Sequence, residues 1–83
     1  MELPGNPVTL SVAQIAELNK QLGFLRHDIN NNLALITAGI EVIQYKPHLA
    51  ERMMATVSEQ PPKIAQALGK FSIEFDKVLG IKR

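Results

Sequence analysis

The stretch IAELNKQLGFLRHDINNNLALITAGIEVI, residues 15–43, decides the fold of this chain. Its large apolar residues recur at steps of three and four, the heptad spacing of a helix that packs along a narrow seam. The seam residues are Ile15, Leu18, Leu22, Leu25, Ile29, Ile36 and Ile43. Two further seam positions hold Asn32 and Gly39, which are not large and apolar. No proline interrupts the pattern before Pro47, so it predicts one long helix.

Local signals mark both ends of this helix. Ser11 and Gln14 have the spacing of a capping box, in which the two side chains bind backbone N–H groups reciprocally. Lys46 precedes Pro47 and is therefore biased away from helical geometry. The first helix is predicted to span about residues 11–45. Residues 1–10, which carry two prolines and a glycine, are predicted to form an irregular lead-in to a single domain over residues 11–83.

A second apolar pattern with the same spacing follows. Its members are Met54, Val57, Pro61, Ile64, Leu68, Phe71, Phe75 and Val78. The pattern predicts a second helix over about residues 48–79. We expect a kink or short break near residues 58–62, because two consecutive prolines there remove backbone hydrogen bonds. Gly80 suits the left-handed residue that often follows a helix. A connection of only a few residues near Lys46 makes the two helices antiparallel.

Two long helices that touch along one line bury little apolar surface. The entropy lost in ordering both helices exceeds what one seam of side chains can offset. Leu33 and Ile40 lie just beside the seam and widen the apolar stripe, as a helix bundle requires. The predicted fold class is therefore all-α: an antiparallel two-helix hairpin that homodimerises into a four-helix bundle.

The overall composition argues against several classes of protein. A net charge of +1 over 83 residues implies no basic face for nucleic acid. The absence of cysteine excludes disulfides and thiolate metal sites, and it fits a cytoplasmic protein. The longest uncharged stretch through the middle, residues 29–40, is shorter than the roughly 20 apolar residues of a membrane span. We expect a cytoplasmic chain with no membrane segment, no metal site and no nucleic-acid partner.

His27 lies on the outer side of the first predicted helix. With Leu22 at heptad position a, His27 falls at position f, away from the seam. Its side chain leans toward the residue one turn earlier, which is Gly23, so nothing covers the imidazole. Asn31 lies one turn later on the same face. The adjoining Asp28 is placed to accept a hydrogen bond from one ring nitrogen, which would leave the other nitrogen nucleophilic.

Residues 27–33, His-Asp-Ile-Asn-Asn-Asn-Leu, resemble the H-box of the dimerisation and histidine phosphotransfer domain of sensor histidine kinases. That motif runs histidine, acid, aliphatic, basic residue or Asn, Thr or Asn, often proline, then leucine. The likeness extends from about Leu18 to Gly80 as helix, H-box, short loop and second helix. Asn32 departs from it by standing where proline is usual, which removes the expected kink in the first helix.

The resemblance implies roles for three residues. His27 would accept a phosphoryl group through its ε nitrogen, Asp28 would assist the transfer, and Asn31 would position a water, as in members that also act as phosphatases. The chain would then belong to two-component signalling, in which a homodimer exchanges phosphate with the aspartate of a response regulator's receiver domain.

The 83 residues contain neither the asparagine box nor the glycine-rich boxes of a kinase ATP-binding domain. No cofactor is therefore expected on this chain, and ATP and Mg²⁺ would act only through a separate ATPase domain. Three interpretations stay open: a part of a sensor kinase, a free-standing phosphotransferase, and a catalytically silent dimerisation and docking module.

Overall fold

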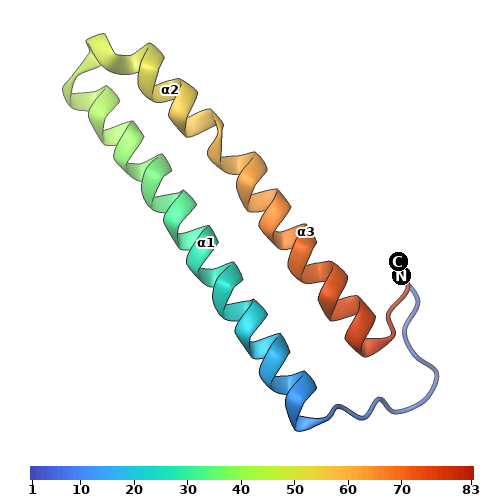
Figure 1. The fold of residues 1–83 in the computed structure, drawn as a ribbon. Coiled ribbons are helices and arrows are strands. Elements are labelled where there is room, and N and C mark those ends of the chain that lie inside the picture. Colours follow the sequence, from blue (N-terminus) through green and yellow to red (C-terminus); the bar gives the residue numbers. More distant parts are fainter.

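The computed structural model describes residues 1–83 and is a helical hairpin. Its elements are α1 (Val12–Tyr45), a short 3₁₀ turn η1 (Pro47–Leu49), α2 (Ala50–Ser58) and α3 (Gln60–Leu79). Figure 1 shows α2 and α3 following one another as a bent rod that lies antiparallel to α1. The prediction of an all-α antiparallel hairpin is confirmed. None of the helices combines the length and the apolar character needed to cross a membrane.

The capping box forms at the start of α1. The Ser11 hydroxyl accepts the backbone N–H of Gln14 at 3.1 Å, and the Gln14 side chain accepts the backbone N–H of Ser11 at 2.8 Å. At the other end Lys46, with φ −135°, leaves helical geometry before Pro47. The observed bounds of α1 therefore differ from the predicted ones by one residue at the start.

The second rod is divided more finely than the sequence pattern predicts. The chain forms a 3₁₀ turn at Pro47–Leu49 and breaks again at Glu59, between α2 and α3. The two consecutive prolines fall in the first turn of α3, where a missing N–H sacrifices no helical hydrogen bond. They therefore begin a new helix, and the interruption at Glu59 falls within residues 58–62, where a kink or short break was expected. The Gln60 amide spans the break by donating to the carbonyl oxygen of Thr56 at 2.9 Å.

The line of contact between α1 and the second rod passes through polar and small residues. Asn32 and Gly39 are the buried residues of α1, at the two seam positions that lack a large apolar side chain. The expected seam of the second helix is reproduced in part. Of the predicted members, Val57, Ile64, Phe71, Phe75 and Val78 are partly buried, whereas Met54 and Leu68 are about half exposed. Gln60, outside the predicted pattern, is 2% exposed.

The two helices form a single layer with two different faces. Successive helical residues are about 100° apart, so Asn31 and Leu33 project to opposite sides of the inward-facing Asn32. The side of Leu33 carries an apolar face that continues onto the second rod and consists of Ile29, Leu33, Ile36, Ile40, Met54, Pro61, Ile64 and Leu68. The molecule measures 58 × 25 × 12 Å, and none of its apolar side chains is fully buried.

The two tails meet at the open end of the hairpin (Figure 1). Glu2 and Lys82 pair through two backbone hydrogen bonds, so the irregular lead-in folds back across this end. Gly80 has φ 69°, the left-handed conformation expected after a helix. Arg83 forms an ion pair with Asp76, at 2.6 Å, and this partner raises the pKa of Arg83. The predicted end of the second helix is therefore closed by a turn and a side-chain contact.

Candidate functional site

His27 stands on the solvent side of α1, in the middle of the helix. Its position follows from the seam, because Asn32 and Gly39 turn toward the second rod and place heptad position f on the outside. No other part of the chain lies within 4 Å of the place where a side chain would start at Gly23, the residue that the imidazole leans over. The ring is therefore open to a large partner.

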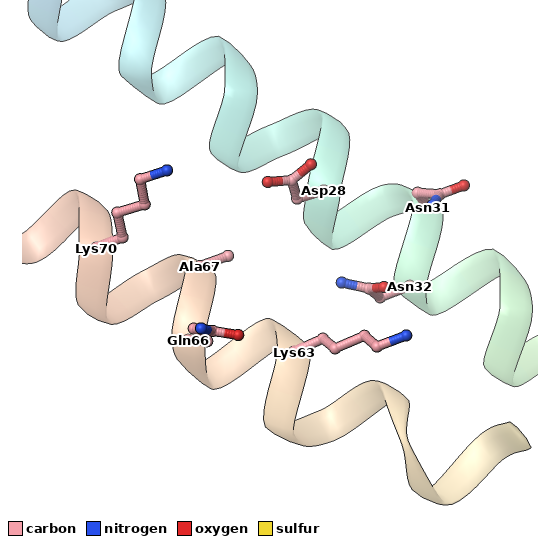
Figure 2. Close-up of a pocket in the computed structure, with 7 residues that line it drawn as sticks. All are labelled: Asp28, Asn31, Asn32, Lys63, Gln66, Ala67 and Lys70. Atoms are coloured by element: carbon pink, nitrogen blue, oxygen red, sulfur yellow. The ribbon is translucent and has the colours of Figure 1, made fainter. Parts of the chain in front are cut away.

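A polar groove lies beside His27, between α1 and α3 (Figure 2). It has a volume of about 350 Å³ and is lined by Asp28, Asn31, Asn32, Lys63, Gln66, Ala67 and Lys70. Figure 2 shows Lys70 extending from α3 toward α1, and Asp28 and Asn32 pointing into the space between the helices. Two of the three residues to which the H-box likeness assigns roles, Asp28 and Asn31, thus line the same groove.

The third of these residues, His27, does not line the groove but adjoins it in sequence. Asp28 makes no hydrogen bond to His27, contrary to the expectation that its carboxylate would hold a ring nitrogen. Both side chains are exposed, and Asn31 is exposed one turn later. The arrangement is an exposed imidazole with a carboxylate and an amide close by on the same helix, and an exposed imidazole is chemically able to act as a nucleophile.

The groove carries two cations that are not paired with carboxylates. Lys63 and Lys70 lie seven residues apart on α3, and the ion pair of Arg83 with Asp76 is the one salt bridge in the structure. The amides of Gln66 and Asn32 add hydrogen-bond donors beside them. The sequence analysis missed this part of the site. The two lysines share a helix face, but the sequence does not say that this face meets Asp28.

A smaller apolar notch continues the groove toward the open end of the hairpin. Gln21, Phe24, Leu25 and Phe71 line it together with Asp28, Ala67 and Lys70, which the notch shares with the groove. Phe24 is 53% exposed, and Lys20 Nζ lies 5.8 Å from the centre of its ring. Such a contact is a weak cation–π interaction at an exposed site. Phe24 is therefore, after Lys63 and Lys70, a further residue of the site that was not predicted from the sequence.

The chain matches no protein-family model, and no curated protein and no solved structure shows significant similarity to it. No three His, Asp or Glu side chains converge on a position that could hold a metal ion. The residues of this site, their positions in the hairpin and the H-box likeness of residues 27–33 are therefore the evidence that bears on function.

Proposed function

We propose that this chain is a histidine phosphotransfer module of two-component signalling, and that His27 exchanges a phosphoryl group with the aspartate of a receiver domain. The observation that carries the proposal is the exposure of His27 on the outer side of α1, over Gly23 and beside the groove that contains Asp28 and Asn31. The H-box likeness of residues 27–33 supports the same assignment. A cytoplasmic location belongs to the proposal.

The chemistry requires a ring nitrogen that is free of a proton and open to attack on phosphorus. The lone pair of that nitrogen forms an N–P bond while the acyl O–P bond of the receiver's aspartyl phosphate breaks, and the electron pair leaves with the aspartate carboxylate. Asp28, next in the chain, favours the positive charge that the imidazole gains during this step. Asn31, which lines the adjacent groove, would orient a water in the hydrolysis of the phosphorylated partner, as the H-box likeness implies.

The proposed active form is a homodimer in which two hairpins pack their apolar faces into a four-helix bundle. The accessible surface of one hairpin is 6404 Å², whereas a compact monomer of this mass exposes about 4,900 Å². The excess, about 1,500 Å² per hairpin, falls in the range that obligate dimers bury. Leu33 and Ile40, which are 48% and 44% exposed, would face the partner hairpin. His27 and the groove lie away from that face and stay accessible.

The proposal is tested by labelling the purified chain with phosphate. Phosphoramidate, a small-molecule donor that releases ammonia when its N–P bond breaks, and each phosphorylated receiver domain encoded in the same genome serve as donors. We expect acid-labile label on the wild type and none on His27→Gln, with the same dimer mass for both proteins in light scattering. The absence of label from every donor contradicts the proposal and favours a silent dimerisation and docking module.

A further inference from the structure

The groove beside His27 is cationic and stays open after dimerisation. Lys63 and Lys70 project from α3 on the side of the hairpin opposite to the apolar face, and neither has a carboxylate within ion-pair distance. Because a second hairpin is proposed to cover the apolar face, it leaves these lysines in water. Two lysines without carboxylate partners at this position therefore suit a partner other than the second hairpin, one that carries negative charge.

The spacing of the lysines defines what they can hold. A separation of seven residues on one helix face places their Cα atoms about 10 Å apart. Figure 2 shows the two side chains directed to different places, Lys70 toward α1 and Lys63 along the groove, so their amino groups do not converge on one point. This arrangement suits two separate carboxylates on one protein surface. The notch at Phe24 continues the groove past Lys70, so an apolar side chain of the same surface can enter there. The groove thus combines two lysines on its α3 side with three apolar side chains, Phe24, Leu25 and Phe71, at the notch.

The transfer reaction itself supplies the reason for such a surface. A phosphoryl donor must bring an anion to His27, and the carboxylate of Asp28 repels that anion. Lys63 and Lys70, across the groove from Asp28, attract an acidic surface of a protein donor during diffusion, and this attraction, which a small donor without such a surface does not use, brings the protein's phosphoryl group to His27.

We infer that the groove between Lys63 and Lys70 is the docking site for an acidic surface of the receiver domain that exchanges phosphate with His27, with an apolar side chain of that receiver in the Phe24 notch. The inference rests on the proposed function. It adds the charge and the spacing of the partner's surface, and it places that surface across α1 and α3 at the level of residues 63–71.

The test uses the receiver domain that labels the wild type. The rate of phosphoryl transfer from this receiver is compared between the wild type and the variants at several salt concentrations. Charge reversal in Lys63→Glu/Lys70→Glu should lower kcat/KM for transfer by about 10-fold or more at low salt, because charge complementarity governs the association rate. It should also flatten the salt dependence. The control Lys77→Glu reverses one charge one heptad beyond the groove on α3, and it should stay within about twofold of the wild type, whereas Lys63→Glu and Lys70→Glu alone should each lower transfer by more. Phe24→Ala should lower transfer without altering the salt dependence.

Phosphoramidate separates docking from chemistry, because it needs no protein surface. Equal labelling of His27 in the wild type and the double variant, with loss of receiver transfer only in the variant, supports the docking site. Unchanged receiver transfer in a double variant that phosphoramidate still labels overturns the docking site and leaves the proposed function standing. The docking site is also overturned, and the proposed function still stands, if Lys77→Glu is equally impaired or if the double variant loses phosphoramidate labelling as well. A wild type that no donor labels overturns the proposed function and this inference together.

Discussion

Gly39 of α1 lies directly against Val57 of α2: a Cβ atom at Gly39 would stand 2.5 Å from Val57 Cγ2. Real Cβ atoms do not approach another atom so closely, so the absence of a side chain at Gly39 sets how near the two helices come at this level. The contact lies near the loop end of the hairpin and above the break at Glu59. It therefore fixes the distance between α1 and the second rod near the loop. The part of the hairpin that contains the groove continues from there toward the open end.

Replacing Gly39 by alanine should destabilise the protein although alanine is the better helix former. The added methyl group collides with a stiff β-branched side chain, and overpacking of this kind costs about 1–3 kcal/mol. Urea unfolding followed by circular dichroism measures the change. Adding Val57→Ala should recover most of the loss, and a double variant as unstable as Gly39→Ala alone would contradict the proposed contact.

Gly69→Ala is the matched control for this experiment. Gly69 lies inside α3 with no atom within 4 Å of its added Cβ, so the substitution meets open space. Its effect should be that of helix propensity alone, a gain of about 0.5–1 kcal/mol in the free energy of unfolding. The two glycines should therefore respond with opposite signs.

A charge on the apolar face should disrupt the proposed dimer. Leu33→Asp puts a carboxylate where the second hairpin would pack, and an unpaired buried charge is expensive. We expect a monomer mass in light scattering and a loss of helical signal at low protein concentration. Ile73→Asp, at a position that is 69% exposed on α3, is the control and should keep the wild-type mass. A Leu33→Asp protein that is still dimeric would refute this packing.

Covering the imidazole should slow transfer while leaving the fold intact. Gly23→Leu adds a side chain on the surface that His27 leans over, where the structure leaves open space. Transfer from a receiver should fall by about 10-fold or more, which corresponds to about 1.4 kcal/mol in the barrier. The melting temperature should rise slightly, because leucine favours a helix more than glycine does. Time courses of phosphoryl transfer and thermal unfolding measure the two effects. Unchanged transfer would show that the partner does not approach His27 over the surface at Gly23.

Removing the buried amide at the break between α2 and α3 should stabilise the protein. Gln60 is 2% exposed, and its Oε1 atom has no hydrogen-bond donor. An unsatisfied buried acceptor costs about 1–3 kcal/mol, whereas the bond from its amide to Thr56 contributes about 1 kcal/mol. Gln60→Met should therefore equal or exceed the wild type in urea unfolding. Gln60→Glu, which buries a charge, should be clearly less stable, and the reverse order would refute this account.

The positions of the helices followed from local patterns in the sequence. The capping box at Ser11, the proline after Lys46 and the glycine at residue 80 act within a few residues of themselves, so their effect does not depend on the rest of the fold. The exposure of His27 followed too, because heptad spacing orders residues around a single helix. Its phosphoryl-accepting role stays a prediction.

The orientation of the second rod could not be read in the same way. Its apolar pattern predicted a seam that includes Met54 and Leu68, but these are about half exposed, and Gln60 is buried instead. Val57, another member of the pattern, does lie against Gly39. Which residues are covered depends on atoms of the facing helix, and a pattern within one helix does not specify them. The pairing of Glu2 with Lys82 was unpredicted for a similar reason, since it joins the two ends of the chain.

The sequence by itself thus determined that the chain forms two long antiparallel helices and that His27 lies on the outside of the first, because periodicity and capping act within one helix. Only the tertiary structure decided that Lys63 and Lys70 face Asp28 across a groove. Residues some 40 positions apart meet according to how one helix is rotated and shifted against the other. That choice depends on the packing of Asn32, Gly39, Val57 and Gln60 between them.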